Sequence, residues 1–459
     1  MNLFDYIHSY AVSAPNCPAI ATGKDYINYK QLEQYIARAA NYILSLKYEP
    51  GDVVFLKLTD KKNYILMFLG GLKAGCRIVP IPDEIKPQSQ EEMSERMKSA
   101  GILTDSIIQD DIFNDDRIST NFDQKNQISE FYHITSGSTG RQKICIRTVD
   151  ALTCEGETYR DALNLTSDDI LLGLSPLSHS FALGAVVAGA FTSGACIFII
   201  NKFVPKTALE LICKEKITRL VMVPVMAKLL CISKTEYQTT VNSLRTVLVG
   251  GGPVTEKTMC LFKKKFGVCI NPTYGSTETG GLLLCKQEQY KNSVGLPMPG
   301  VEVKVVDSKG NAGYRNCQGQ LWVRCRGMLK GYLDEFFTVF DQEGYFPMGD
   351  LVYVNNAGFI YITGRIKNMI NIGGKKVNPL EVEEVLNKMS GVKECVVIGM
   401  KQKDKEVIKA VIVPNGNLQK QDVRRHCLKE LESYKLPKII EMQSQLPKNE
   451  MGKIKKEEL

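Results

Sequence analysis

Short β-rich runs alternate with helical stretches along the N-terminal part of the chain, and this alternation constrains the fold more than any other feature. Apolar residues recur with helical spacing at 31–46 and 64–74. Strands that alternate with helices form parallel sheets with helices on their faces. We therefore predict an α/β fold with parallel-rich sheets. The expected strands are 52–58, 76–81, 219–223, 246–249 and 268–270.

The pattern changes twice toward the C-terminus. Strands of a more antiparallel kind are expected at 301–306, 319–323 and 358–362, which predicts a β-rich subdomain. A chain of 459 residues is too long for one hydrophobic core. We expect a large N-terminal domain over 1–366 and a small mobile α+β domain over 367–459, with a hinge near Lys367. The small domain's expected elements are a helix at 380–388, strands at 394–399 and 407–414, and a helix at 421–434.

The composition argues against several classes of protein. A formal net charge of +8 is modest and spread along the chain, so we expect no nucleic-acid partner. The 14 cysteines occur singly, without a CxxC pair, and only 4 histidines accompany them. This pattern fits reduced thiols better than a disulfide framework or a zinc site. The residues after Met1 lack the layout of a signal peptide, and we expect a cytoplasmic protein.

One long segment, 170–200, contains no Asp, Glu, Lys or Arg and is long enough to be a candidate transmembrane helix. However, Pro176, Gly184, Gly189 and Gly194 interrupt it. We therefore expect a buried glycine-rich helix that breaks near Gly194, followed by a strand at 195–200, and no membrane insertion.

The first candidate site is a loop rich in glycine and hydroxyl groups that follows the β-like residues 131–134. Glycines let the backbone turn its N–H groups inward, hydroxyls add donors and the final lysine adds positive charge, so the loop suits a polyphosphate. It matches neither a Walker A motif nor GxGxxG. The alternative is a flexible Ser/Gly linker. The candidate residues are Thr135, Ser136, Gly137, Ser138, Thr139, Gly140 and Lys143.

The second candidate site is the segment 271–280, which the glycine turn Gly250, Gly251 and Gly252 precedes. Tyr274, which Gly275 follows, offers a flat face to a purine. Thr277 offers a hydroxyl to a phosphate oxygen, and Glu278 offers a hard oxygen ligand for Mg²⁺. The alternative is a surface turn capped by Ser and Thr.

Two further segments carry isolated charges on glycine turns. Asp350 follows Gly349 and can accept hydrogen bonds from ribose hydroxyls, while Arg365, in the segment that begins with Tyr361, can reach a ribose or phosphate oxygen. Lys453 follows Gly452 and could neutralise a carboxylate that attacks a phosphate. Taken singly, these residues would be ordinary solvated charges.

Together and in this order, the segments resemble the acyl-adenylate-forming superfamily, which includes acyl- and aryl-CoA ligases, nonribosomal adenylation domains and firefly luciferase. The resemblance extends from Tyr29-Lys30-Gln31-Leu32 through Leu72-Lys73-Ala74-Gly75 to Gly452-Lys453. It implies that ATP and Mg²⁺ activate a small carboxylic acid, whose acyl group then passes to a thiol.

The resemblance also implies roles for residues. The 135–143 loop would bind the β- and γ-phosphates, and Lys453 would bridge acid and phosphate. The small domain would then rotate about Lys367 and bring Gly373 and Gly374 toward the thiol. The remaining roles are adenine contacts by Gly250, Gly251, Gly252 and Tyr274, an α-phosphate contact by Thr277, Mg²⁺ binding by Glu278, and ribose contacts by Asp350 and Arg365.

Two departures from the family pattern stand out. Gln142 occupies the place of a usual proline in the phosphate loop, and the linker between Gly101 and Gln127 is short. The first loosens the turn without removing a phosphate donor. Because of the short linker, we assign no residue roles from the family to that region.

The segment 175–183 bears on the acid. It carries no carboxylate, and a buried ammonium without a partner is costly, so we expect an aryl or acyl acid and not an amino acid. The resemblance places His179 beside the acyl and thiol tunnels; a core histidine is the alternative. The thiol is expected in trans, as coenzyme A or as the phosphopantetheine of a stand-alone carrier protein. A non-catalytic nucleotide-binding protein remains the alternative of another class.

Overall fold

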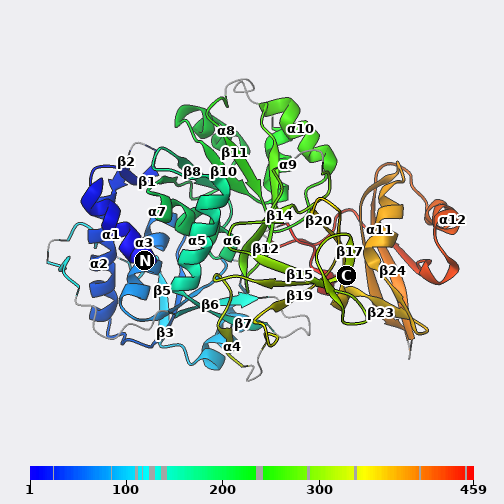
Figure 1. Cartoon of the computed structure of the whole chain (residues 1–459), viewed down its shortest axis with the longest axis horizontal. Coiled ribbons are helices and arrows are strands. Elements are labelled where there is room, and N and C mark those ends of the chain that lie inside the picture. The colour runs from blue at the N-terminus through cyan, green and yellow to red at the C-terminus, as the bar shows by residue number, and fades with distance from the viewer. Residues whose placement is uncertain are drawn as a thin grey trace. The chain divides into compact units, whose positions relative to one another are not determined.

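The computed structural model describes residues 1–23, 25–83, 85–108, 112–115, 117–122, 130–135, 142–233, 241–286, 290–334, 339–402, 405–449 and 452–459 (Figure 1). These residues form two compact units. The first unit comprises Met1–Glu302 and Arg324–Gly344, and the second comprises Val303–Val323 and Tyr345–Leu459. The domain boundary expected at 366/367 stays a prediction.

A nine-stranded sheet dominates the first unit. Its six central strands are parallel, and antiparallel strands extend it at both sides. In spatial order the strands are β14 (Leu296–Pro297), β13 (Gly280–Leu284), β12 (Ile270–Ser276), β11 (Thr246–Val249), β10 (Arg219–Met222), β8 (Ile170–Gly173), β9 (Cys196–Phe198), β1 (Pro18–Thr22) and β2 (Asp25–Asn28).

A six-stranded sheet completes the framework of this unit. Four of its strands are parallel; the last of these four forms an antiparallel hairpin with the next strand, and a short antiparallel strand lies at the edge. In spatial order these are β5 (Gly101–Thr104), β3 (Val53–Lys57), β4 (Arg77–Pro80), β6 (Glu130–Thr135), β7 (Lys143–Thr148) and β18 (Gly331–Tyr332). The predicted α/β fold with parallel-rich sheets is confirmed.

Several helices of the first unit begin at residues whose side chains cap them. Asn28 forms a capping box with Gln31 at the start of the second helix, and Thr148 caps the fifth. Figure 1 shows α1, α2 and α3 together, and α9 beside α10. The helices are α1 (Leu3–Ser13), α2 (Tyr29–Ser45), α3 (Lys61–Lys73), α4 (Pro87–Met97), α5 (Val149–Leu163), α6 (Ser180–Ala182), α7 (Gly189–Ser193), α8 (Pro205–Lys214), α9 (Pro224–Ile232) and α10 (Glu256–Phe266).

The uncharged segment 170–200 folds into the core. It contains β8, then α6, a π-helix η1 (Leu183–Ala188), α7 and β9, and Gly194 ends the helical part at φ +74°. The residues from Ala182 to Ile200 are buried. The expected break near Gly194 is therefore confirmed, while the π-helix was not foreseen. Among the described residues, no helix is long and apolar enough to cross a membrane.

A buried ion pair lies at the amino-terminal ends of the parallel strands, which we call the amino edge. Arg219 Nε lies 2.9 Å from Asp169 Oδ1, and the two side chains are 9% and 0% exposed. Thr218 Oγ1 donates to the same carboxylate at 2.7 Å, as does the backbone N–H of Thr166 at 3.1 Å. Burial alone would raise the pKa of Asp169, but these hydrogen bonds, with those from Arg219, hold it below its ordinary value.

The second unit contains three small sheets. The first consists of β16 (Ala312–Gly313), β15 (Glu302–Val306), β17 (Cys317–Arg324), β19 (Phe346–Val354) and β20 (Ile360–Arg365) in spatial order. In it, β16 pairs antiparallel with β15, and β19 pairs antiparallel with β17 and β20. The second is the hairpin β21 (Ile370–Ile372) and β22 (Lys375–Val377), which follows the 3-10 helix η2 (Ile366–Asn368). This arrangement confirms a β-rich region after the α/β part.

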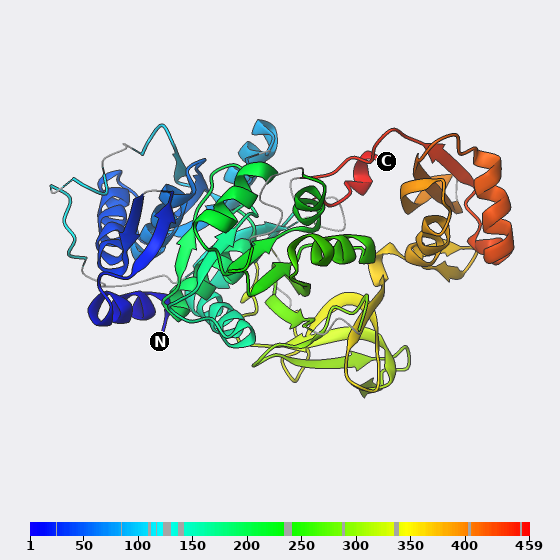
Figure 2. The same cartoon turned by 90° about the horizontal axis from the view of Figure 1, so that it is seen from above.

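The third sheet and its helices form the C-terminal part (Figures 1 and 2). Its strands are β23 (Val392–Gln402), β24 (Lys405–Pro414) and β25 (Ile439–Met442). Two helices, α11 (Pro379–Asn387) and α12 (Lys420–Glu430), pack against this sheet around a shared apolar core. Helix α12 ends four residues before the predicted end, because Leu431 takes an extended conformation. The short helices η3 (Ser433–Lys435) and η4 (Lys456–Glu458) complete the unit.

Candidate functional site

Several predicted residues lie where the parallel strands of the nine-stranded sheet end, which we call the carboxyl edge. Gly250 directly follows β11, and Thr277 directly follows β12. Gly250 is tightly enclosed, because a Cβ there would lie 2.8 Å from Thr273 Cγ2 and 2.9 Å from Phe181 Cζ. The carboxyl ends of parallel strands are the usual place for ligands in open α/β sheets.

The chain reverses tightly between β12 and β13 in residues 276–281, called the Thr277 turn below. Ser276 and Thr279 close it, because the Thr279 N–H donates to the Ser276 carbonyl at 3.3 Å and their hydroxyls lie 3.2 Å apart. Strand β12 extends through Asn271 and Pro272, so the segment 271–280 is a strand followed by a turn. The predicted strand at 268–270 captured only its first residue.

Thr277 and Glu278 have partners from distant parts of the first unit. Ser180 Oγ donates to Thr277 Oγ1 at 3.3 Å, which joins this turn to the start of α6. Tyr332 OH donates to Glu278 Oε1 at 3.0 Å, and Lys143 Nζ lies 4.5 Å from the centre of the same phenol ring. The Tyr332 phenol therefore contacts a cation with its ring and a carboxylate with its hydroxyl. Of the predicted residues, Lys143 and Glu278 thus both contact Tyr332, and Thr277 directly precedes Glu278 in the turn.

The predicted phosphate loop is the connection of the β6–β7 hairpin. Thr135 and Lys143 pair in register where the strands meet this connection, and Thr135 Oγ1 donates to the Lys143 carbonyl at 3.3 Å. Gln142 is exposed, and its carbonyl accepts from Arg96 Nη1 at 2.6 Å. The other predicted residues, Ser136, Gly137, Ser138, Thr139 and Gly140, lie outside the described residues.

The predicted adenine-binding residues also lie at the carboxyl edge. Tyr274 is half-buried on β12 opposite Leu283. Gly275 passes very close to the next strand, since a Cβ there would lie 2.1 Å from the Gly280 carbonyl oxygen. Gly251 has φ +82°, a left-handed conformation that favours glycine, and Gly252 follows it.

His179 is half-buried and directly precedes α6. The sequence reasoning missed a second histidine, His133, on β6. This side chain is 2% exposed, and neither ring nitrogen has a hydrogen-bond partner within the described parts of the chain. Burial, with smaller contributions from Arg147 and His179, holds the pKa of His133 well below its ordinary value. His133 is therefore a neutral imidazole near pH 7.

A second buried ion pair lies beside the Thr277 turn. Arg147 Nη2 on β7 lies 2.9 Å from Glu155 Oε2 on α5, and the two side chains are 0% and 2% exposed. Burial raises the pKa of Glu155 more than Arg147 lowers it. Glu155 is thus a carboxylate near α6 that the sequence reasoning did not identify, although Arg147 already neutralises it. Asp169, one of the carboxylates nearest in sequence, is held by Arg219 at the amino edge.

In the second unit, two predicted ribose contacts are neighbours. Asp350 on β19 pairs in register with Arg365 on β20, and Arg365 Nε lies 3.1 Å from Asp350 Oδ1. Asp350 is buried, and Gly349 before it has φ +73°. Tyr361 lies on β20, and its ring centre is 6.1 Å from that of Tyr353.

The remaining predicted residues occupy turns of the second unit. Lys367 is exposed on η2, between β20 and β21. Gly373 and Gly374 form the two-residue turn of the β21–β22 hairpin with φ +58° and +89°, as such turns require. Lys453 is exposed on a tight turn, in which its N–H donates to Asn449 Oδ1 at 2.9 Å and its carbonyl accepts from the Asn449 N–H at 3.0 Å.

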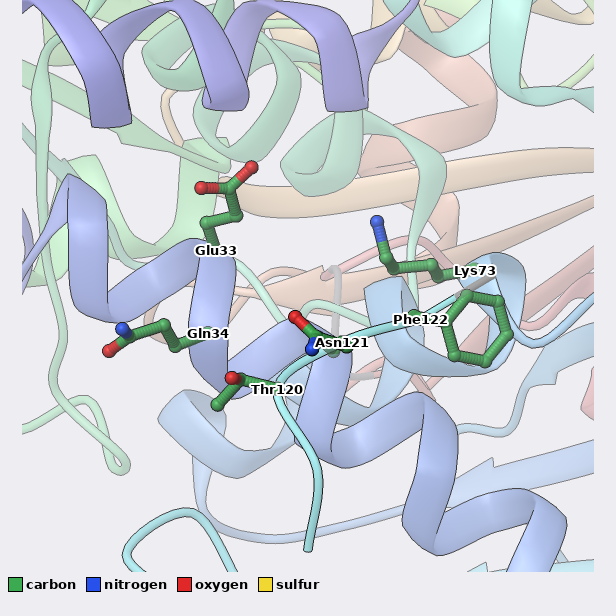
Figure 3. A pocket seen from close by; sticks show the side chains of 7 residues that line it. Glu33, Gln34, Lys73, Thr120, Asn121 and Phe122 are labelled. Carbon is green, nitrogen blue, oxygen red and sulfur yellow. The ribbon is translucent and has the colours of Figure 1, made fainter. Parts of the chain in front are cut away.

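A surface hollow of about 620 Å³ lies elsewhere in the first unit (Figure 3). It is formed by α2, the end of α3 and residues 120–122. Lys73 Nζ lies 6.0 Å from the centre of the Phe122 ring at its wall. None of the predicted site residues lines this hollow, so it is separate from the carboxyl edge. The lining residues are Glu33, Gln34, Ala37, Lys73, Thr120, Asn121 and Phe122.

Comparison with known proteins places this arrangement in a wider group. A family described as AMP-binding enzyme matches residues 8–333, and one described as AMP-binding enzyme C-terminal domain matches residues 381–453. A feruloyl-CoA synthase of Amycolatopsis sp is 27% identical over 473 residues, which cover 97% of this chain and 96% of the relative. A 3,4-dihydroxybenzoate–aryl-carrier-protein ligase of Bacillus anthracis is 25% identical over 433 residues, which cover 93% and 92%.

The fold has solved counterparts as well. The crystal structure of ATP-bound MatB from Rhodopseudomonas palustris superposes with a TM-score of 0.88 at 25% identity, over 100% of this chain and 98% of that chain.

Proposed function

Because this chain belongs to the family of AMP-binding enzymes, we propose that it activates a carboxylic acid with ATP to an acyl-adenylate and transfers the acyl group to a thiol. The observation that carries the proposal is the group formed by Lys143, Glu278 and Thr277, which two separate segments of the first unit supply and which Tyr332 links from a third. A cation, a carboxylate and a hydroxyl are the groups that a nucleotide triphosphate with its metal needs.

In the first step, the acid's carboxylate attacks the α-phosphorus of ATP and pyrophosphate leaves. Negative charge spreads over the phosphate oxygens during this step, and catalysis consists mainly of positioning and of neutralising that charge. Lys143 would neutralise charge on the departing phosphates, and Thr277 would donate its hydroxyl to an α-phosphate oxygen. Lys453 would bridge the attacking carboxylate and the phosphate.

The donor set suits Mg²⁺. This ion is usually held by one or two carboxylates together with substrate phosphates. Glu278 fits that pattern, because Tyr332 occupies its Oε1 with a hydrogen bond and thereby fixes the direction of Oε2. Mg²⁺ bound there would neutralise charge on the phosphates of ATP.

The roles in the second unit rest on proximity within that unit. Asp350 and Arg365 are held together on neighbouring strands, which suits a shared contact with ribose hydroxyls. In the thiol step, rotation about Lys367 would withdraw Lys453 and present the Gly373–Gly374 turn to the thiol.

The substrate is proposed to be an aryl or acyl acid without an ammonium group. Among the carboxylates near α6, Glu155 is neutralised by Arg147, so it offers an ammonium no uncompensated negative partner. Coenzyme A is the favoured thiol, in line with the feruloyl-CoA synthase relative. A carrier-protein phosphopantetheine is the second candidate, which the aryl-carrier-protein ligase relative favours.

Acid-dependent ATP–pyrophosphate exchange tests the first step. Benzoates, cinnamates, short and medium fatty acids, and amino acids form the panel. Exchange with one aryl or acyl group of acids supports the proposal, and exchange only with an amino acid refutes the substrate class. If a folded protein that binds MgATP shows no exchange with any acid of the panel, the proposed function is refuted. Turnover with free coenzyme A then separates the two thiols.

The two-step cycle predicts a split effect for Lys453→Ala. Adenylation should fall by about 100-fold or more, because a charge that neutralises the transition state is lost. Thioester formation from supplied acyl-adenylate should stay within a few-fold of the wild-type rate. Lys455→Ala is the matched control, since Lys455 carries the same charge two residues away and pairs with Glu458 at 3.3 Å. Equal loss of both half-reactions would contradict the cycle.

A further inference from the structure

The buried pair of Arg147 and Glu155 is not explained by the proposed chemistry. Neither residue is assigned a contact with ATP, the acid or the thiol. The pair is also imperfectly satisfied: Arg147 Nε and Nη1 have no hydrogen-bond partner within the described residues, and Glu155 Oε2 is close to Arg147 but poorly aligned for a hydrogen bond. A buried pair of this kind is weak evidence for stability, so its position calls for another reason.

Glu155 supports the Thr277 turn from the side of α5. The N–H of Gly281, the last residue of this turn, donates to Glu155 Oε1 at 3.1 Å. The carboxylate also fills the space beside Gly280, where a Cβ would lie 2.5 Å from Glu155 Cδ. Gly280 has φ +70°, so the turn needs glycine there for its backbone as well. The turn therefore rests directly on this carboxylate.

Arg147 supports the same turn indirectly, through the segment 325–329. Arg147 Nη2 donates to the Gly327 carbonyl at 2.8 Å. Two residues later, the Leu329 N–H donates to the Glu278 carbonyl at 2.6 Å. The Cys325 thiol contacts the Thr279 carbonyl at 3.6 Å. This segment thus holds the backbone of the turn at two points, and Arg147 holds the segment.

From these contacts we infer that Arg147 and Glu155 are positioning residues, which fix the Thr277 turn so that Thr277 and Glu278 meet the nucleotide in a productive geometry. The inference rests on the roles proposed for Thr277 and Glu278. Its physical basis is that a displacement of about 1 Å in such a group can cost about 100-fold in rate. A buried ion pair that holds a short turn both directly and through the segment 325–329 limits such displacements.

Two double variants test this inference with matched volume and charge. Arg147→Met/Glu155→Gln removes both charges and keeps an amide oxygen that can accept from the Gly281 N–H. Arg147→Met/Glu155→Leu removes both charges and that acceptor. We expect the Leu variant to show a kcat for pyrophosphate exchange about 10- to 100-fold below that of the Gln variant. We also expect it to need more Mg²⁺ for half-maximal exchange, with little change in KM for the acid.

The pair at the amino edge provides the control. Arg219→Met/Asp169→Asn and Arg219→Met/Asp169→Leu make the same changes in a buried pair that does not contact the Thr277 turn. All rates are measured below the lowest unfolding midpoint of the four variants. Equal kcat and Mg²⁺ requirement in the Gln and Leu variants would overturn the inference. An equal fall in the control series would also overturn it, because the effect would then be general destabilisation.

Two further measurements keep the inference testable. If the Leu variant does not fold, Arg147→Lys replaces it: this variant keeps the charge next to Glu155 but cannot reproduce the guanidinium contact with Gly327. A several-fold fall in kcat with unchanged KM for the acid supports the inference, and wild-type kcat overturns it. If the wild-type protein exchanges with no acid, only the proposed function fails. The rise in unfolding midpoint caused by MgATP then tests positioning, since a smaller rise in the Leu variant than in the Gln variant is expected and an equal rise overturns it.

Discussion

The first unit buries two ion pairs of similar burial but different surroundings. At the amino edge, Asp169 accepts from Arg219, Thr218 and the Thr166 N–H. Beside the Thr277 turn, Glu155 accepts one backbone hydrogen bond, and Arg147 leaves two nitrogens without a partner among the described residues. The pKa of Asp169 is lowered and that of Glu155 is raised. Burial is the largest influence on both carboxylates and raises the pKa of each; the hydrogen bonds outweigh it at Asp169 but do not outweigh it at Glu155.

The difference follows the organisation of the sheet. The amino edge contains none of the predicted site residues, and its polar groups satisfy one another. At the carboxyl edge, the buried polar groups hold the Thr277 turn, which we propose must keep one geometry in order to bind the nucleotide. Incompletely satisfied buried groups at such an edge indicate a requirement other than stability.

The largest expected effect tests whether the two edges differ in function at all. Glu278→Gln at the carboxyl edge should lower the rate of pyrophosphate exchange by about 100- to 1000-fold, because a charge that holds Mg²⁺ is lost while the amide can still accept from Tyr332. Exchange is measured against Mg²⁺ concentration. Arg245→Ala at the amino edge, whose Nη1 is 3.6 Å from Asp169 Oδ1, should leave the rate unchanged. A wild-type Mg²⁺ dependence in Glu278→Gln would remove the distinction between the edges.

An intermediate effect concerns the pH dependence of stability, where the two pairs should have opposite signs. The pKa of Asp169 is below its ordinary 3.8, so its stabilisation is present above that pH and is lost as pH falls through the folded value. The pKa of Glu155 is above its ordinary 4.5, so its contribution to the free energy of unfolding decreases as pH rises from 4.5 through the folded value.

Urea unfolding between pH 3 and pH 8, roughly the range over which carboxylates control stability, measures this difference. Asp169→Asn should remove the acid-side loss, and Glu155→Gln should remove the decrease at higher pH. Changes of the same sign in both variants would show that the hydrogen-bond count does not separate the two pairs.

The smallest expected effect concerns Tyr332, which links Lys143 to Glu278. Tyr332→Phe removes the hydroxyl and keeps the ring under Lys143, so exchange should fall by only about five-fold, the equivalent of about 1 kcal/mol for one hydrogen bond. Tyr42→Phe loses a comparable hydroxyl contact, at 2.7 Å to the Ile107 carbonyl, and serves as the control. A fall in Tyr332→Phe as large as that in Glu278→Gln would make the phenol a principal group of the site.

Much of the fold was predictable from local pattern. Strand β11 was predicted at its observed bounds, and α2, α3 and β10 within two or three residues, because apolar spacing and caps are encoded within each segment. The end of α12 was missed, since an extended Leu431 is set by packing in the C-terminal part. Strand β12 was underestimated, because Pro272 and the small residues near it are typical of a turn.

Candidate site residues could be predicted only where they belong to a recognisable sequence motif. Lys143, Thr277 and Glu278 lie in glycine-rich segments that stand out in the sequence. Tyr332 and Glu155 do not, because a tyrosine after a glycine and a glutamate inside a helix have no distinctive neighbours. Arg147 even sits on a strand where apolar residues would be expected. Their significance comes from contacts between segments far apart in the chain, such as 54 residues between Tyr332 and Glu278 and 126 between Gly281 and Glu155.

Gly184 in the π-helix shows that a glycine does not by itself leave empty space in a packed protein. Read alone, a glycine in an apolar helix offers a vacancy that a ligand's tail could enter. Here a Cβ at Gly184 would lie 2.0 Å from Glu155 Oε1, so a side chain of the neighbouring helix α5 already fills that space. Residue 184 therefore cannot grow unless residue 155 shrinks, and a shorter residue at 155 would create the vacancy that Gly184 alone does not provide. Position 155 can therefore become smaller while Gly184 stays unchanged, but position 184 can become larger only after position 155 has become smaller.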